Sequence, residues 1–507
     1  MLQIKNLGIN LIKDDRDLLK DFDFALNQGD KVGLIGEEGN GKSILLKTII
    51  DRKSVENYAQ ISGEIYKKEE IIGYLPQSLD ENFLEMTVET YMNKVLDMSL
   101  LDYNKLYKYL DQFGLDEDLV FGKLKLGNLS GGERIKALLL FELLKEPTVF
   151  LFDEPTNDLD YRSASFITKL MAEMKIPLIF VSHDPELLRK VANRIVHLEQ
   201  VHRRQVPRFT VFNGSYDRYV KERENQIRIQ NARANKEREE FTKKAERYRK
   251  VYDSVNHAIN ATKNDIEGKN LKDKMASVKS LGKRLDKEKE NLTQRPDFED
   301  SIGIFFDDSI DIPNSKVVLD VNLDELLAGE KILSKNIELK VVGPEKICII
   351  GKNGAGKTTL LKEIYKCLEK TNLKIGYMPQ DYFEYLKDSE TPISYLAKQD
   401  SKDEKTRVSN LLGSLNFSRE EMERSLKSLS GGQKAKVFFA KMNMDRAEVL
   451  LLDEPTRNLS PTSQPEIIES LKSYKGAIIA VSHDRDFIRE VFDRVYELDS
   501  KGLMQIN

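Results

Sequence analysis

Short apolar runs mark the two halves of this chain in the same way. Val32–Ile35 and Val149–Phe152 lie in the first half, and Ile347–Ile350 and Val449–Leu452 lie in the second. Runs of this length without polar alternation are typical of strands buried on both faces of a sheet. The pattern therefore predicts an α/β protein with one buried sheet in each half.

Residues 216–295 follow a different pattern, because their apolar side chains recur every seven positions. The first series is Val220, Ile227, Ala234, Phe241, Tyr248 and Val255, and the second is Leu271, Val278, Leu285 and Leu292. Such a repeat places the apolar side chains on one side of a helix, where a second helix can pack. Turn-forming residues at 260–270, including Asn264, Asp265, Gly268 and Asn270, separate the series. We predict an antiparallel helical hairpin whose first helix, Tyr216–Ile259, extends for about 65 Å at about 1.5 Å per residue.

Each half also carries a glycine-rich loop with the spacing Gly-x4-Gly-Lys-Ser/Thr, directly after an apolar run. The residues that we predict to bind nucleotide are Gly36, Gly39, Asn40, Gly41, Lys42 and Ser43 in the first loop, and Gly351, Asn353, Gly354, Ala355, Gly356, Lys357, Thr358 and Thr359 in the second. In such loops backbone N–H groups surround phosphate oxygens, the lysine reaches the terminal phosphates, and the hydroxyl binds Mg²⁺. Two loops predict two nucleotides per chain.

Three further motifs repeat at a constant spacing of 300 residues. They are Leu129–Glu133 and Leu429–Gln433, Asp153–Thr156 and Asp453–Thr456, and Val181–Asp184 and Val481–Asp484. A repeat of this length indicates two related domains rather than a solenoid. The chain resembles the ATP-binding cassette proteins, whose Leu-Ser-Gly-Gly signature separates them from other proteins with phosphate-binding loops.

The resemblance implies a role for each repeated polar residue. Lys42 and Lys357 would hold the β- and γ-phosphates of ATP. The residues implied as Mg²⁺ ligands or their support are Ser43, Thr358, Asp153, Asp453, Gln77 and Gln380. Glu154 and Glu454 would polarise the attacking water, and His183 and His483 would contact the γ-phosphate. The implied activity is therefore ATP hydrolysis.

In the same family, the signature of one cassette closes the nucleotide site of the other. Ser430, Gly431 and Gly432 would complete the first site, and Ser130, Gly131 and Gly132 the second. The chain would then be a monomer whose two cassettes pair around ATP and separate after hydrolysis. We expect a first cassette at 1–215, the hairpin at 216–298 and a second cassette at 299–507.

The two sites differ in sequence. Glu37 and Glu38 lie in the first loop, where carboxylates should weaken anion binding unless they point outward. Asp160 has no acidic counterpart, because Ser460 replaces it. No aromatic residue stands at the position expected to stack on adenine, so the preference for ATP over GTP stays open. We expect unequal sites.

Charge distinguishes the predicted hairpin from the rest of the chain. Residues 216–295 contain 22 Lys/Arg and 14 Asp/Glu, a net charge of +8, whereas the remaining residues sum to −12. A basic segment in an acidic protein favours a polyanionic partner. The two cysteines, and the absence of a signal peptide and of any apolar stretch of about 20 residues, predict a reduced, cytoplasmic protein without a membrane partner.

Two cassettes joined by a basic hairpin resemble the ABC-F family, and Glu454–Pro461 resembles the antibiotic-resistance members of Gram-positive bacteria. This resemblance implies binding to the 70S ribosome near the tRNA exit site, with the hairpin reaching toward P-site tRNA, 23S rRNA and the peptidyl transferase centre. It further implies protection of the ribosome by expulsion of a bound antibiotic. The candidate RNA-binding residues are Lys263, Lys269, Lys272 and Lys274.

Three alternatives stay open. A general ABC-F translation factor would share every motif but confer no resistance. An ATPase subunit of a transporter would have no need of a basic hairpin. A DNA-repair or chromosome ATPase would carry its coil inside one cassette, between the phosphate loop and the signature, whereas this segment lies between complete cassettes.

Overall fold

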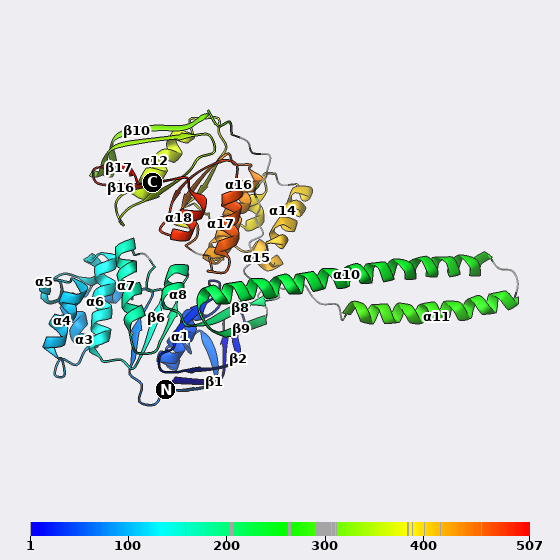
Figure 1. Ribbon diagram of the computed structural model, residues 1–507, viewed down its shortest axis with the longest axis horizontal. Helices are drawn as coiled ribbons and strands as arrows, with labels where there is room; N and C mark the ends of the chain where they lie inside the picture. The colour runs from blue at the N-terminus through cyan, green and yellow to red at the C-terminus, as the bar shows by residue number, and fades with distance from the viewer. Residues whose placement is uncertain are drawn as a thin grey trace. The chain divides into compact units, whose positions relative to one another are not determined.

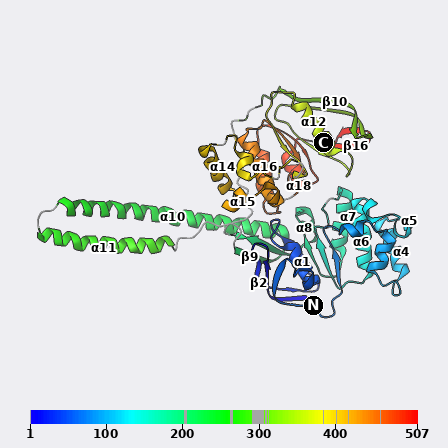
Figure 2. The same ribbon diagram turned by 180° about the vertical axis from the view of Figure 1, so that it is seen from behind.

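The computed structural model describes residues 2–157, 159–201, 206–261, 265–290, 306, 310, 312–382, 385–387, 389–399, 401–415, 417–457 and 459–506. It divides into two compact units, one formed by residues 1–216 with 299–507 and the other by residues 217–298. The first unit contains two cassettes of the same architecture, and the second is a pair of helices (Figures 1 and 2). This is the α/β fold class, with two cassettes and a helical insertion, that the sequence predicts.

The first cassette is built on a six-stranded sheet of order β5-β6-β7-β3-β8-β9. In that order the strands are Ile72–Leu75, Val149–Asp153, Leu178–Val181, Lys31–Ile35, Arg194–Gln200 and Val206–Asn213. Every neighbouring pair is parallel except β8 and β9. The strand that precedes the phosphate loop, β3, is therefore central and almost wholly buried, as its apolar sequence predicts.

An antiparallel sheet and two groups of helices complete the first cassette. The antiparallel strands, in the order β2-β1-β4, are Arg16–Leu26, Leu2–Leu11 and Ala59–Tyr66. The helices are α1 Lys42–Ile50, α2 Glu81–Leu84, α3 Val88–Val95, α4 Tyr103–Phe113, α5 Glu117–Phe121, α6 Gly131–Leu144, α7 Tyr161–Glu173 and α8 Pro185–Val191. Phe22 of β2, Leu46 of α1 and Val196 of β8 lie in a common apolar core.

The second cassette repeats this plan with a shorter antiparallel part. Its main sheet, in the order β13-β14-β15-β12-β16-β17, is formed by Ile375–Met378, Val449–Asp453, Ala477–Val481, Lys346–Ile350, Arg494–Asp499 and Gly502–Gln505. A hairpin of β10 (Val317–Ala328) and β11 (Lys331–Val342) takes the place of the three-stranded sheet. The helices are α12 Lys357–Leu368, α13 Pro392–Leu396, α14 Lys402–Ser414, α15 Arg419–Glu423, α16 Gly431–Met444, α17 Gln464–Ser473 and α18 Arg485–Val491.

The second unit is an antiparallel pair of helices, α10 (Tyr216–Ala261) and α11 (Asp265–Glu290). Val255 of α10 packs against Met275 and Val278 of α11 in a small buried cluster. Lys244 also pairs with Glu288 across the two helices. The predicted turn at 260–270 is too long, because α11 already begins at Asp265. Gly268 and Asn270 are consequently helical, although both residue types favour turns.

Candidate nucleotide sites

Both phosphate loops connect the central strand of a sheet to a helix. The loop after β3 leads into α1, and the loop after β12 leads into α12, so the N–H groups of each helix N-terminus face the loop. Gly36 has φ +145° and Gly351 has φ +152°, and a Cβ on either would meet a carbonyl oxygen of the adjoining strand. Only glycine fits these two positions without strain.

The two loop lysines fold back over their own loops. Lys42 Nζ donates to the carbonyl oxygens of Gly36, at 2.7 Å, and Glu37, at 2.9 Å. Lys357 Nζ donates to Gly351, at 2.8 Å, and to Lys352, at 3.0 Å. Each ammonium group therefore lies at the mouth of the loop, where the terminal phosphates of a nucleotide are predicted to bind.

The predicted Mg²⁺ residues come together at the ends of β6 and β14. Ser43 Oγ donates to Asp153 Oδ1 at 3.0 Å. Thr358 lies close enough to Asp453 to lower the pKa of its carboxyl group. Both buried carboxylate oxygens of Asp453 nevertheless lack a hydrogen-bond partner of normal geometry among the described residues. Burial raises the pKa of both aspartates, and the nearby loop lysines oppose this effect. Buried carboxylates beside a hydroxyl suit Mg²⁺, which prefers oxygen ligands and is completed by phosphate and water.

Glu154 and His183 form a buried pair at the ends of β6 and β7. The backbone N–H of His183 donates to Glu154 Oε2 at 3.2 Å, and the ring nitrogen Nε2 of His183 lies 3.3 Å from Glu154 Oε1. Burial raises the pKa of Glu154 to about 7 and lowers that of His183 to about 3. The imidazole is therefore neutral near pH 7, and the carboxyl group is close to half ionised, which suits a group that accepts a proton from water.

Glu454 and His483 form the corresponding pair in the second site with a looser ring contact. The ring nitrogen Nε2 of His483 lies 3.7 Å from Glu454 Oε1, and the backbone N–H of His483 donates to Glu454 Oε2 at 3.3 Å. Burial raises the pKa of Glu454 to about 8 and lowers that of His483 to about 4. Glu154 and Glu454 both have φ near +50°, in the left-handed region that glutamate rarely adopts. Such backbone strain is typical of functional sites.

The two glutamates of the first loop contact the second cassette. Glu37 is buried, and its Oε1 accepts a hydrogen bond from Ser463 Oγ at 2.8 Å. Glu38 Oε2 accepts one from the N–H of Gly431, the first residue of α16. The signature helix of the second cassette therefore faces the first phosphate loop, as the paired-cassette prediction requires. A carboxylate stands at that helix N-terminus, where the prediction places the γ-phosphate.

The second site is less closely joined. Ser130 caps α6 through Glu133, and among the described residues no hydrogen bond joins Ser130, Gly131 or Gly132 to the second loop. Asp160 of the first cassette is nevertheless close enough to Lys357 and His483 to raise the pKa of each, against the stronger effect of burial. Both cassettes thus contribute charge to the second site, whereas the first site is also bridged by hydrogen bonds from its loop glutamates.

One cavity of about 1050 Å³ takes in most of the predicted residues of both sites. They are Gly39, Gly41, Lys42, Ser43, Gln77, Glu154 and His183 from the first cassette, and Asn353, Gly354, Gly356, Lys357, Thr358, Thr359, Gln380, Asp453, Glu454 and His483 from the second. Asn40 is turned away, because its amide donates to the carbonyl of Leu198. Lys269, Lys272 and Lys274 are exposed on α11, and Lys263 lies outside the described residues.

The cavity also includes residues that sequence reasoning did not single out. Leu18 packs beside Gly41, and Leu333 beside Gly356, so an aliphatic side chain lies next to each phosphate loop within the cavity. Gln464 lies at the start of α17 and reaches the first site from the second cassette. Gln464 lies eight residues after Thr456 in the sequence and belongs to no motif, so the sequence does not point to it.

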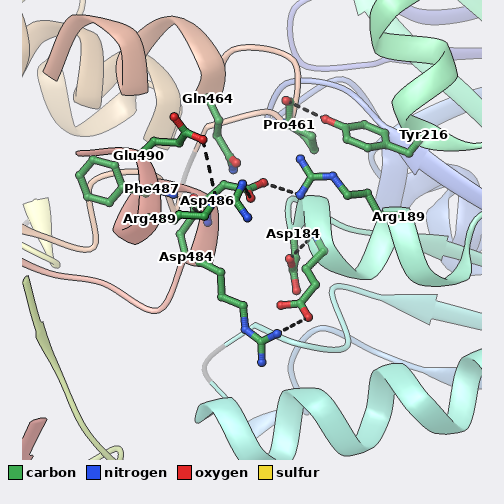
Figure 3. Close-up of polar contacts among 12 residues, drawn as sticks. Asp184, Arg189, Tyr216, Pro461, Gln464, Asp484, Asp486, Phe487, Arg489 and Glu490 are labelled. Atoms are coloured by element: carbon green, nitrogen blue, oxygen red, sulfur yellow. Dashed lines mark hydrogen bonds and ion pairs between the residues drawn. The ribbon is translucent and has the colours of Figure 1, made fainter. Parts of the chain in front are cut away.

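Figure 3 shows the polar contacts that join the two cassettes around α8 and α18. Arg189 of α8 pairs with Asp486 of α18, and Arg485 pairs with Glu186 in the opposite direction at 2.6 Å. The hydroxyl of the buried Tyr216 donates to the carbonyl of Pro461 at 2.9 Å. These contacts fix the segment after each histidine against the other cassette.

The family model of the ABC transporter matches residues 19–157 and 334–457, one segment within each cassette. The chain belongs to the ABC transporter family. It is accordingly an ATPase of the ATP-binding cassette type, a class that binds nucleotide. Among the described residues, no helix is both long and apolar enough to cross a bilayer.

Similarity over almost the whole chain is to F-type members of this family. The chain is 29% identical to "Ribosome protection protein VmlR" of Bacillus subtilis, over 96% of this chain and 85% of the relative. It is 27% identical to "ABC transporter F family member 5" of Arabidopsis thaliana, over 95% of this chain and 73% of the relative. It is 26% identical to "ATP-binding cassette sub-family F member 3" of Homo sapiens, over 100% and 72%. These matches support the ABC-F branch predicted from the sequence.

Some solved structures share this fold over nearly the whole chain. The archaeal ribosome recycling factor aABCE1, solved with the ribosomal stalk protein aP1, matches with a TM-score of 0.59 and 19% identity. That match covers 99% of this chain and 90% of the other. The RNase-L inhibitor matches with a TM-score of 0.56 and 19% identity, covering 98% and 90%. At this identity the likeness concerns the fold alone.

Proposed function

We propose that this chain is a cytoplasmic ABC-F ATPase that binds the 70S ribosome near the tRNA exit site and dislodges antibiotics from it. The observation that carries the proposal is the combination of paired cassettes with a basic helical hairpin, in a chain similar along 96% of its length to a ribosome protection protein. The hairpin lies wholly within the stretch between the two matched segments, 19–157 and 334–457, of the ABC transporter model. Its net charge of +8 suits a partner rich in phosphate.

In the proposed cycle, ATP joins the cassettes and hydrolysis releases them. The γ-phosphate in the first site would lie between Lys42 and the N-terminus of α16, replacing the carboxylate of Glu38 there. Mg²⁺ would be held by Ser43 and supported by Asp153, and it would neutralise charge on the phosphates. Glu154 would take a proton from the attacking water. Its raised pKa and its contact with His183 support that role.

The hairpin would carry the effect of ATP binding to the ribosome. Lys269, Lys272 and Lys274 are exposed near the end of α11 that follows the turn, where they could contact rRNA or P-site tRNA phosphates. Lys263 belongs to the same proposal by its position in the sequence. Each phosphate contact would steepen the dependence of ribosome binding on salt.

The test is drug susceptibility in a sensitive Gram-positive host that produces the wild-type chain or the double variant Glu154→Gln, Glu454→Gln. We expect resistance confined to drugs of the peptidyl transferase centre, and its loss in the double variant. Ribosomes from the double variant should retain the protein after sedimentation in ATP. No change in susceptibility to any such drug would refute the protective role.

A matched pair of hairpin variants tests the basic surface separately. The first variant replaces Lys269, Lys272 and Lys274 by Ala, and the control replaces Lys279, Lys283 and Arg284 by Ala. Both remove three exposed cations from α11. We expect the first to lose protection while it keeps ATPase activity, and the control to keep both. Equal loss in the two variants would mean that only net charge matters.

A general translation factor is the second candidate. It is favoured by the similar match to F family members whose names mention no drug, such as member 5 of Arabidopsis thaliana. Growth arrest by the double variant in a host where the wild type gives no protection would support this function. Sedimentation with membranes rather than ribosomes would point instead to a transporter subunit.

A further inference from the structure

Gln464 connects the two cassettes at the first site. It is buried, with 4% of its surface exposed, and it begins α17 of the second cassette. Its Nε2 donates to the carbonyl of His183 in the first cassette at 2.9 Å. The same amide lies 3.3 Å from the carbonyl of Leu459 and 3.4 Å from that of Thr456. One side chain thus holds the segment that follows Glu454 against the backbone of His183.

The held segment in turn contacts the His183 ring. His183 Nδ1 lies 3.0 Å from the carbonyl oxygen of Leu459. A carbonyl oxygen can only accept, so a hydrogen bond here requires the proton on Nδ1. Nε2 of the neutral ring then presents a lone pair toward Glu154 Oε1, 3.3 Å away. The second cassette consequently selects both the orientation and the tautomer of His183.

The second site lacks this arrangement. The 300-residue repeat places Ala164 at the position of Gln464, and alanine has no side-chain donor. Among the described residues, the His483 ring makes no hydrogen bond to Leu159, the counterpart of Leu459, and its distance to Glu454 is 3.7 Å rather than 3.3 Å. The difference between the two histidines therefore follows the difference between Gln464 and Ala164.

A purely structural role explains Gln464 poorly. Its Oε1 is buried without a hydrogen-bond partner among the described residues. An unpaired buried carbonyl group costs about 1–3 kcal/mol, so an apolar side chain of the same size would serve stability better. The Gln464 amide donates to the segment that orients His183, and this contact gives a functional reason for a buried amide at the position.

We propose that Gln464 is a positioning residue for ATP hydrolysis in the first site, where it fixes His183 from the opposite cassette, and that Ala164 leaves the second site without this aid. The inference rests on the proposed roles of Glu154 and His183, and it adds a cause for unequal turnover in the two sites. Because Gln464 touches His183 rather than the predicted position of the phosphates, its loss should slow hydrolysis without weakening ATP binding.

The test is steady-state ATPase activity of the full chain with one site silenced at a time. Glu454→Gln leaves the first site active, and Glu154→Gln leaves the second. Gln464→Met keeps the volume of the side chain but removes its donor. In the Glu454→Gln background we expect it to lower kcat by about 10- to 100-fold with KM unchanged, because a reacting group misplaced by about 1 Å can cost about 100-fold. In the Glu154→Gln background it should leave kcat within twofold.

Two further variants make the outcome decisive. Ala164→Gln in the Glu154→Gln background should raise kcat, because it gives the second site the missing donor. Glu469→Ala, at an exposed position of the same helix, should change neither background. Equal losses in both backgrounds, or a raised KM with unchanged kcat, would overturn the positioning role. If the single variants Glu154→Gln and Glu454→Gln keep full wild-type turnover, the proposed catalytic roles of the two glutamates are refuted, which is a separate outcome from the failure of the positioning role.

Discussion

Glu154→Gln should stabilise the nucleotide-free protein, and by an amount that grows with pH. In the folded state the Glu154 carboxyl group is buried beside His183, and its pKa is raised from 4.5 to about 7. Glutamine keeps the shape of the side chain and can still accept the hydrogen bond from the His183 N–H. It removes only the ionisation, so the pH dependence of the difference between the two proteins reports the burial of that charge.

The sign follows from the direction of the pKa shift. Between about pH 4.5 and 7 the folded protein keeps a proton on Glu154 that the unfolded chain has lost, so stability falls as pH rises. The full loss is about 3–4 kcal/mol, because the folded and unfolded pKa values differ by about 2.5 and each pKa unit corresponds to about 1.4 kcal/mol. At pH 5 only about 1 kcal/mol of this has been lost. The stabilising effect of the substitution should therefore be about 2–3 kcal/mol larger at pH 8 than at pH 5.

The assay is denaturant unfolding at pH 5 and pH 8 without nucleotide, for the wild type and for Glu154→Gln. Titrating groups that do not interact with Glu154 are common to both proteins and cancel in the comparison, whereas Asp184, whose charge contributes to the raised pKa of Glu154, contributes to the measured difference. Glu173→Gln, at an exposed position of α7, serves as the control and should show no pH-dependent difference. A stabilisation by Glu154→Gln that is the same at both pH values would refute the claim that a buried, neutral carboxyl group stands at this position.

Three other substitutions follow from the same contacts. Glu38→Asn, which copies Asn353 of the second loop, should tighten ATP binding to the first site several-fold. The Glu38 carboxylate is stabilised by about 0.3–1 kcal/mol at the N-terminus of α16, and in the variant ATP no longer has to displace it. Titration with a fluorescent ATP analogue measures the affinity. Tyr216→Phe leaves the carbonyl of Pro461 unpaired and should cost about 1–3 kcal/mol in denaturant unfolding. Gly36→Ala should abolish nucleotide binding at the first site in the same titration, because its Cβ would meet a carbonyl of β8.

The fold was predictable from the sequence because its signals are local. The apolar run at Val32–Ile35 gives β3, and the glycines after it give the loop and the start of α1. The seven-residue spacing gives the two helices, since Val255 and Val278 meet as that spacing requires. The turn between them was predicted less well, because turn propensity at Gly268 is weaker than the continuation of a packed helix.

Contacts between cassettes were only partly predictable. The position of Ser430 and Gly431 opposite the first loop followed from the family resemblance. The contacts of Glu37 and Glu38 did not, because a sequence states the charge of a side chain but not the group that it meets. Gln464 carries no motif at all, and its importance appears only once α17 is placed beside the first site.

The differences between the sites point in one direction. In the first site, side chains of one cassette reach the other through Glu37, Glu38 and Gln464. In the second, the contribution seen among the described residues is mainly the charge of Asp160, which acts on Lys357 and His483 without a hydrogen bond to either. Hydrogen bonds demand a defined geometry, whereas a charge acts over a range of distances. The second site can therefore open while the first keeps its contacts, so we expect the second to exchange nucleotide more freely and the first to set when the cassettes separate.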